Sequence, residues 1–453
     1  MTNDAAVPTA GTTPKADARR SWRDLAGGEI DTRLLGMLAA LAVIWIGFHL
    51  MSDGKFITSR NLWNLSVQST SIAIMATGMV LIIVTRNIDL SVGSLLGFLG
   101  YTMALVQTDG QISVFGLNLT IDWLRDSELA WLVALAIGIA LGALVGSVQG
   151  FIVAYVGVPA FIVTLGGYLA WRGLIFRTGG KQGQTLAPLD AKFRYLGGAP
   201  ERSLGATYSW ILVLVIVAGI VYTLIQARRR RQRHDLTLRP IAVDVSLAVV
   251  SSLVVVLGVW WIAIRYDSPV SGEPVGVAYP VLILFAVTGA MSYLARRRRF
   301  GRYVYAYGGN PEAAELGGIN TRRTITATFA LMGTLCALSA AIQTARLNSA
   351  TTNLGVQNEL DVIAAAVIGG TSFSGGIGTI PGAVLGAVVM QSLRSGMSLL
   401  NIDSPTQDIV VAVVLVTAVA IDALLRQRRR QAVFGALAAG VFIAAVVIQT
   451  GRP

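Results

Sequence analysis

The side chains that could do chemistry in this sequence are concentrated at two breaks, where an apolar stretch gives way to small polar residues and then resumes. The first break reads RNIDLSVGSLLG, from Arg86 to Gly97, and contains Asp89. The second reads IGGTSFSGGIGTIPGAVLG, from Ile368 to Gly386, and Asp361 lies shortly before it. Hydroxyl and carboxyl groups of this kind can form hydrogen bonds with a neutral polar ligand.

Such paired breaks have two explanations. In membrane transporters, interrupted helices in corresponding positions of the two halves often mark the substrate pathway. Small residues also allow helices to pack closely, and for any single residue this explanation is as good as the first. Both stay open at this point.

The sequence predicts no catalytic site, no metal site and no cofactor held by this chain. The segment Gly179-Gly180-Lys181-Gln182 lacks both the upstream glycine and the following Ser or Thr of a phosphate-binding loop. The two histidines, His49 and His234, are far apart, and Cys336 is the one cysteine, so a cluster of metal ligands is not expected. The few acids within apolar stretches do not form the converging set that catalysis inside a membrane requires.

The composition indicates which kind of structure holds these residues in place. Of 453 residues, 54% are hydrophobic and 13% are charged, and the mean hydropathy is +0.65, which is typical of a membrane protein. A helix needs about 20 apolar residues to span the hydrocarbon. We therefore predict an all-α, polytopic membrane bundle of about twelve transmembrane helices. The candidate spans are Leu34–Met51, Leu65–Val84, Ile88–Val106, Ala130–Tyr155, Pro159–Ile175, Tyr208–Ile225, Val243–Ile264, Val277–Ala295, Ile325–Ala345, Leu360–Gly370, Pro381–Leu400, Asp408–Leu425 and Ala432–Ile448.

The formal net charge of +12 is explained by short basic runs beside apolar segments. These runs are Arg228–Arg231, Arg296–Arg299 and Arg428–Arg430. Cytoplasmic loops carry such an excess of positive charge, so the pattern favours membrane lipid as a partner and disfavours nucleic acid. With the N-terminus in the cytoplasm, counting crossings places the loops after the sixth and eighth spans inside.

Three regions are expected along the chain. Residues 1–33 read as a disordered cytoplasmic tail without the apolar core of a signal peptide. Residues 34–430 form the transmembrane domain, and residues 431–453 are an extra hydrophobic segment. The helix expected at 432–448 either crosses the membrane or lies on its surface.

The loop at 296–323 contains the most specific local pattern. Asn310 is a good N-cap, Pro311 suits the first turn of a helix, and Glu312 lies near its positive end. Gly317 and Gly318 are typical of a helix end. A short helix in a cytoplasmic loop has little to pack against in its own membrane domain, so we expect it to contact a partner; resting on lipid headgroups is the alternative.

Four long segments carry a resemblance to a known family. They are TGMVLIIVTRNIDLSVGS (Thr77–Ser94), VPAFIVTLGGYLAWRG (Val158–Gly173), GRYVYAYGGNPEAAELGGIN (Gly301–Asn320) and LDVIAAAVIGGTSFSGGIGTIPGAVLGA (Leu360–Ala387). In this order they resemble the permeases of the ribose and xylose branch of bacterial ABC importers, and the xylose permeases most closely. The two spans within 208–264 are similar to an insertion of the xylose branch. The long tail and the segment after residue 430 depart from the family pattern.

The resemblance implies a permease subunit of the bacterial inner membrane that imports a monosaccharide, D-xylose first, by alternating access. It implies three partners: a second copy of this chain, a cytosolic ATPase with two nucleotide-binding halves that binds ATP and Mg, and an extracytoplasmic sugar-binding protein. It also implies an ATPase-coupling helix. That helix and its flanks comprise Asn310, Pro311, Glu312, Ala313, Ala314, Glu315, Leu316, Gly317, Gly318, Ile319 and Asn320.

A neutral sugar needs hydrogen-bonding groups rather than charge along its path. The candidate pathway residues are therefore Asp89, Ser91, Ser94, Thr164, Asp361, Thr371, Ser372 and Ser374. An ion-coupled secondary sugar transporter is the alternative, and in it Asp89 or Asp361 would be essential. A membrane enzyme acting on lipid-linked sugars would need a clustered set of acids, which the sequence does not show.

Overall fold

The computed structural model describes residues 32–114, 117–125, 127–178, 184–234, 238 and 240–426. Several expectations lie outside these residues: nearly all of the tail at 1–33, the segment 179–182, the arginines at 428–430 and the segment 431–453 with its helix at 432–448.

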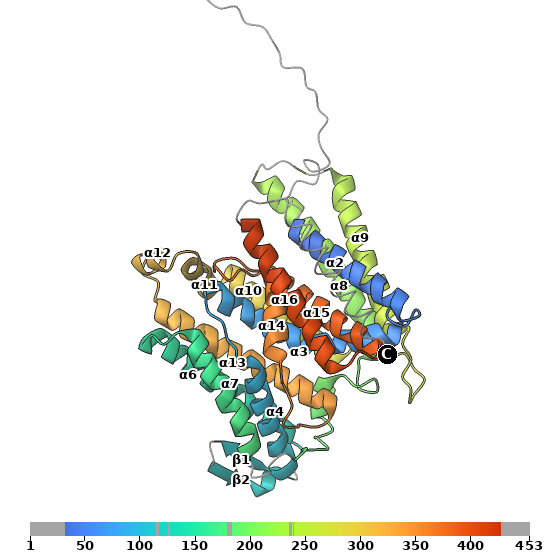
Figure 1. Ribbon diagram of the computed structural model, residues 1–453. Helices are drawn as coiled ribbons and strands as arrows, with labels where there is room; N and C mark the ends of the chain where they lie inside the picture. The colour runs from blue at the N-terminus through green and yellow to red at the C-terminus, as the bar shows by residue number, and fades with distance from the viewer. Residues whose placement is uncertain are drawn as a thin grey trace, which may run out of the picture.

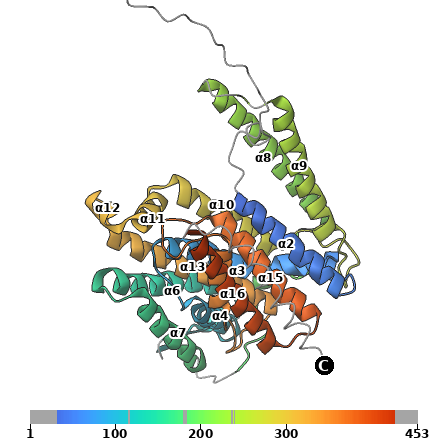
Figure 2. The ribbon, with the colours of Figure 1, turned by 45° about the horizontal axis from the view of Figure 1, so that its top comes forward.

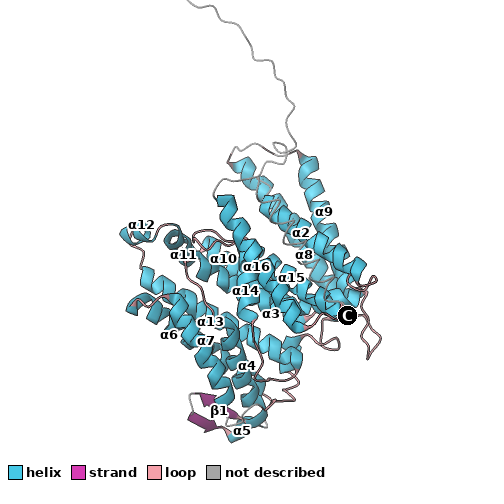
Figure 3. Cartoon of the chain, viewed as in Figure 1, coloured by secondary structure: helices cyan, strands magenta, loops and turns pink. Residues whose placement is uncertain are grey.

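Helices make up almost all of the described structure (Figures 1 and 3). The α-helices are α2 (Thr32–Met51), α3 (Ser59–Val84), α4 (Val92–Asp109), α5 (Asp122–Arg125), α6 (Ala130–Phe151), α7 (Ala160–Arg177), α8 (Gly205–Arg233), α9 (Ile241–Val259), α10 (Tyr279–Arg297), α11 (Arg299–Gly309), α12 (Pro311–Leu316), α13 (Thr321–Leu347), α14 (Asn358–Ile368), α15 (Ile380–Leu399) and α16 (Ser404–Arg426). Short turns of π-helix, η1 (Ile152–Val156) and η4 (Trp260–Ile264), follow α6 and α9, and η3 (Phe193–Gly197) is a 3-10 helix.

The all-α prediction holds for the helical bundle but missed a small hairpin. Strands β1 (Gln111–Val114) and β2 (Leu117–Thr120) pair antiparallel, with Gln111 opposite Thr120. They lie in the loop after α4, where no apolar helical period was present to predict structure.

Helix α3 forms the centre of the bundle, and almost all of its side chains are buried. Helices α13, α14 and α15 pack directly on α3, and α4 packs on α13. Helices α6 and α7 cover the outer side of α4 and α13 (Figure 1). The contact of α6 with α13 is close because Gly142 and Gly333 face each other's backbone and leave no room for a Cβ. This is packing through small residues, as expected in a membrane bundle.

Helices α8 and α9 form a hairpin that stands apart from the bundle (Figure 2). Most of its apolar side chains are exposed, and the ion pair of Arg228 with Asp244, 2.6 Å apart, joins the two helices near their connection. Among the described residues, six helices are long and apolar enough to cross a membrane: Ser59–Val84, Ala130–Val156, Gly205–Arg233, Ile241–Ile264, Tyr279–Arg297 and Thr321–Leu347. The chain is therefore a polytopic helical membrane protein.

Two spans differ from prediction. The helix expected from Ile88 begins only at Val92, because residues 85–91 form a non-helical turn in which Thr85, Asp89 and Ser91 are buried. The span expected at Leu360–Gly370 contains α14, whose 11 residues are too few to cross a membrane as a helix. The non-helical residues before α14 cover the rest of the distance across the bundle, since Ala350 pairs with Leu186 at the end opposite to the end of α14.

The bundle has two opposite ends. At one end, which we call the α12 end, the last residues of α3, the junction of α11 with α12 and the loop 369–379 meet. At the other end lie the β-hairpin of β1 and β2 and the loops before α6 and α8. We call this the hairpin end, after the β-hairpin and not after the α8–α9 pair. There Lys192 donates a 2.8 Å hydrogen bond to Glu128, which lowers the pKa of the Glu128 carboxyl.

Candidate functional site

The short helix predicted in the loop 296–323 is present as α12. The Asn310 side chain accepts a 3.0 Å hydrogen bond from the backbone N–H of Ala313, and Pro311 occupies the first turn. After Gly317, the left-handed backbone of Gly318, with φ of +78°, lets the N–H of Ile319 return to the carbonyl of Ala314. Both predicted ends are confirmed, because capping depends on residues within one turn of the helix.

The outer surface of α12 is available for contact. Ala314 is buried against the chain, whereas Glu312 and Glu315 are exposed. Leu316 is 92% exposed, which is unusual for a leucine at the tip of an ordered helix. This surface combines an apolar side chain with two carboxylates, and α12 lies at the edge of the bundle (Figure 1).

The first group of predicted pathway residues forms a closed hydrogen-bond network. The Asp89 carboxylate accepts bonds from the backbone N–H and the hydroxyl of Ser91, at 2.9 and 2.7 Å. The Ser91 hydroxyl also accepts a 3.0 Å bond from Gln149 of α6, and Thr164 of α7 donates to the carbonyl of Ile88.

All the predicted members of this network are buried, including Ser94, which donates to the Ser91 carbonyl. The network fixes the start of α4 against α6 and α7. It therefore supports the packing explanation for this break.

The predicted residues Thr371, Ser372 and Ser374 lie in the loop between α14 and α15 at the α12 end. Thr371 and Ser372 are fully buried, and the hydroxyls of Ser372 and Ser374 are 2.9 Å apart. The structure thus divides the eight predicted pathway residues among three places.

Asp361 lies at the third place, where a polar cavity opens. Arg394 of α15 binds both carboxylate oxygens of Asp361, at 2.8 and 2.9 Å, and reaches Asp408 of α16 at 3.4 Å. The Asp361 side chain is only 7% exposed. A bidentate arginine is the arrangement that best satisfies a buried carboxylate.

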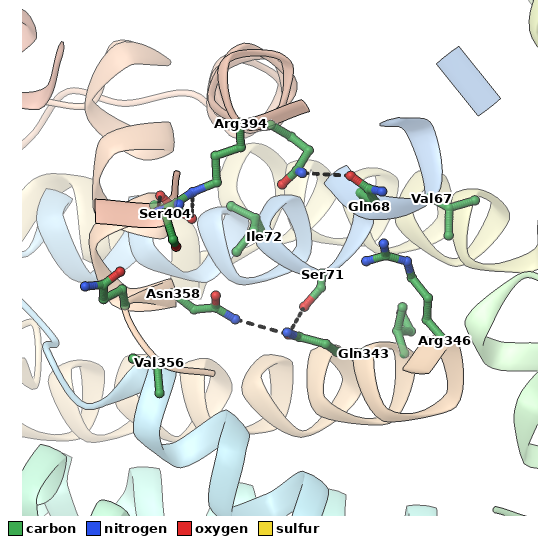
Figure 4. A pocket seen from close by; sticks show the side chains of 14 residues that line it. Val67, Gln68, Ser71, Ile72, Gln343, Arg346, Val356, Asn358, Arg394 and Ser404 are labelled. Atoms are coloured by element: carbon green, nitrogen blue, oxygen red, sulfur yellow. Dashed lines mark hydrogen bonds and ion pairs between the residues drawn. The ribbon is translucent and has the colours of Figure 1, made fainter. Parts of the chain in front are cut away.

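The cavity has a volume of about 320 Å³, at the small end of ordinary ligand pockets. Helices α3, α13, α14 and α15 contribute to its wall (Figure 4). The polar neutral groups in this wall are Gln68, Ser71, Gln343, Gln357, Asn358, Gln391 and Ser404. The charged ones are Arg346, Asp361 and Arg394.

Hydrogen bonds hold the cavity wall together across helices. The Gln343 side-chain oxygen accepts bonds from Ser71 at 3.3 Å and Asn358 at 3.1 Å. Gln391 donates to Gln68 at 3.0 Å. Figure 4 shows Gln68 and Ser71 on α3 facing Gln343 on α13. The arrangement presents donors and acceptors in fixed positions, which suits a small ligand rich in hydroxyl groups.

Sequence reasoning found Asp361 but missed the other lining residues. A signal was present: Gln68 with Ser71, Gln343 with Arg346, and Gln391 with Arg394 are polar pairs three residues apart within apolar helices. Residues at this spacing lie on one helix face, and a polar face inside a membrane helix points toward the protein interior or a pathway.

The pattern of a protein family described as branched-chain amino acid transport system, permease component, matches residues 61–419. The polytopic helical fold agrees with it, and the chain belongs to this family of ABC-importer permeases.

Among the relatives, the xylose transport system permease protein XylH of Escherichia coli K12 is 36% identical over 401 residues, covering 88% of this chain and 94% of that protein. XylH of Haemophilus influenzae is 37% identical over 386 residues, covering 85% and 95% of the two chains. The ribose import permease protein RbsC of Escherichia coli K12 is 35% identical over 386 residues, covering 85% and 92%. No solved structure gives a significant match.

The predicted class is therefore confirmed. The chain is the permease component of an ABC sugar importer, a multi-pass membrane subunit related to bacterial inner-membrane permeases, and it is a transport subunit without ATPase activity. Permeases of this kind work with an ATPase and a binding protein. The ion-coupled secondary transporter is excluded by this family membership.

Proposed function

We propose that this chain forms the membrane path for import of D-xylose, as a homodimer in the bacterial inner membrane. Relatives named for xylose transport match it at 36% and 37% identity. A relative named for ribose matches at 35%, so identity alone favours xylose only slightly. The α8–α9 hairpin, by resemblance a feature of the xylose branch, adds support.

The polar cavity is the observation on which this proposal depends most. Its volume and its amide and hydroxyl lining suit one monosaccharide. We assign the sugar-contacting role to Gln68, Gln343, Asn358 and Gln391 in place of the Ser91 and Ser372 regions. Asp361 contributes by fixing Arg394 in the cavity wall.

We assign the ATPase contact to α12 and its flanks, from Asn310 to Asn320. The exposed Leu316 side chain and the two neighbouring carboxylates give a partner something to bury and something to pair with. ATP and Mg would be bound by that partner, and closure of its two nucleotide-binding halves would displace α12 and switch the access of the cavity.

This assignment includes an orientation. The α12 end would face the cytoplasm together with the N-terminus, and the hairpin end would face the sugar-binding protein. Following the chain from α2 to α16, with the path 348–368 counted as one crossing, gives twelve crossings. The arginine-rich ends of α8 and α10 then lie inside, as the positive-inside rule requires.

Reconstitution into proteoliposomes tests the function. The purified permease, its ATPase and its binding protein are combined, and uptake of labelled xylose is measured with ATP present. Xylose uptake should require both partners, and unlabelled xylose should compete better than ribose or galactose. Stronger competition by ribose would overturn the assignment of xylose, and unchanged uptake without the ATPase would overturn the coupled mechanism.

A further inference from the structure

We propose that Arg86 is a positioning residue that links the movement of α12 to the two breaks in the membrane helices. This inference rests on the proposed role of α12 in ATPase coupling. Arg86 lies outside the polar network of Asp89 and outside the polar cavity, so neither of those sites explains its geometry.

The backbone of Arg86 is unusual for its residue type. Helix α3 ends in a Schellman motif, in which the N–H of Arg86 bonds to the carbonyl of Ile83 and the N–H of Asn87 to that of Ile82, at 2.8 and 3.1 Å. The motif places Arg86 at φ of +61°. Glycine is the usual residue there, because a side chain makes this left-handed conformation costly. A strained arginine at this position indicates that its side chain serves a purpose.

The Arg86 side chain binds the residues directly before α12. The Arg86 Nε donates to the carbonyl of Gly308 and one Nη donates to the carbonyl of Gly309, both at 2.9 Å. These are the last two residues of α11, and Asn310, the cap of α12, follows them. The planar guanidinium thus binds two successive carbonyls in a fixed geometry, which a single-point donor could not do.

A third segment packs on the same arginine. Gly375, in the loop between α14 and α15, approaches the Arg86 side chain so closely that a Cβ there would lie 2.5 Å from Arg86 Cγ. The next residue, Gly376, donates its N–H to the carbonyl of Val84 at the end of α3, at 3.0 Å. Both sequence breaks and the coupling helix therefore meet at one side chain.

This junction gives a short mechanical path from the α12 surface to the helices of the cavity. The loop 369–379 follows α14, which carries Asp361, and leads into α15, which carries Arg394 and Gln391. When α12 moves, the carbonyls of Gly308 and Gly309 move with it, and Arg86 transmits the displacement to the ends of α3, α14 and α15. The coupling depends on the guanidinium and not on the turn itself.

The variant Arg86→Gly separates these two roles. Glycine keeps the left-handed turn and relieves its strain, so the protein should fold and still co-purify with its ATPase. Xylose transported per ATP hydrolysed should fall about tenfold, within the range of ordinary coupling between sites. Arg86→Lys, which keeps the charge but not the paired bonds, should give an intermediate ratio. The matched control is Arg299→Gln, an exposed arginine on α11, and its ratio should match the wild type.

Hydrogen exchange supplies a readout independent of transport. Binding of the ATPase should change exchange in residues 369–379 of the wild type, and Arg86→Gly should abolish that change while exchange in α12 still responds. An unchanged transport-to-ATP ratio in Arg86→Gly, or an equal loss in Arg299→Gln, would overturn the inference. Failure of the wild-type complex to couple ATP to xylose uptake would instead overturn the proposed function.

Discussion

The ion pair between Arg394 and Asp361 holds a buried carboxylate inside the helical bundle. It joins α15 to α14 beside the cavity, and the Asp361 side chain has almost no access to solvent. Arg394 also reaches Asp408 of α16. One arginine therefore orients two acids from different helices, and this fixes the charged part of the cavity wall.

Removal of this arginine should be costly to the fold. In Arg394→Met, the Asp361 carboxylate loses its partner in a buried position, which typically destabilises a protein by about 3 kcal/mol or more. Thermal unfolding in detergent should show a clear decrease in Tm, and the double variant Asp361→Asn with Arg394→Met should recover much of it. Arg323→Met, at an exposed position, is the matched control. A Tm equal to the wild type in Arg394→Met would show that the pair does not stabilise the wall.

The same residues show what sequence reasoning can reach. The Asn310 cap and the Gly317–Gly318 stop were predictable because each acts within a few residues of the helix it bounds. For the cavity, the polar pairs gave a signal on each helix by itself, but not the cavity. Gln68, Gln343 and Gln391 come from helices far apart in sequence, and only tertiary packing places them around one space. The role of the hydroxyls near Asp89 could not be decided from the sequence, because a hydrogen-bond network that fixes helices and a substrate path contain the same residue types.

Among the elements, α12 and the interrupted helices lie together, and their geometry fits the proposed coupling to the ATPase. Helix α12 is short, capped at both ends and exposed on its outer surface. The segment 85–91 and the loop 369–379 are irregular, and both contact the residues directly before α12, through Arg86 and Gly376. A short capped helix beside two non-helical segments is an arrangement in which a displacement of the helix can move the longer helices attached to those segments.

Leu316 of α12 allows a direct test of the proposed contact between α12 and the ATPase. Burial of a leucine side chain contributes about 1.5–3 kcal/mol, so Leu316→Ala should weaken ATPase binding at least about tenfold. Because Leu316 makes almost no contact within the chain, Tm should not change. Leu129→Ala, which alters a 54% exposed leucine at the hairpin end, should leave binding of the ATPase unchanged. Undiminished affinity in Leu316→Ala, measured by titration in detergent, would remove α12 as the main contact.

At the scale of the whole molecule, the cavity and α12 belong to opposite parts of one bundle. The cavity wall uses the first half of α3 and the last turns of α13. The end of α11, directly before α12, instead packs on the last residue of α3, and α12 contacts α13. The proposed orientation therefore places the sugar site toward the binding protein and the energy input toward the cytoplasm. This separation requires movement to be transmitted along α3, α14 and α15.

Site-directed labelling of the cavity during transport tests whether the sugar crosses the membrane through this cavity. Cys336 is buried, so Cys336→Ala provides a background in which Gln391→Cys is the one reactive site. An impermeant thiol reagent added on the side of the binding protein should block ATP-driven xylose uptake, and xylose should slow the labelling. Labelling of Leu129→Cys, which lies outside the cavity, should proceed at the same rate with and without xylose. Full modification of Gln391→Cys with undiminished uptake would contradict the account, because sugar would then cross the membrane without passing through this cavity.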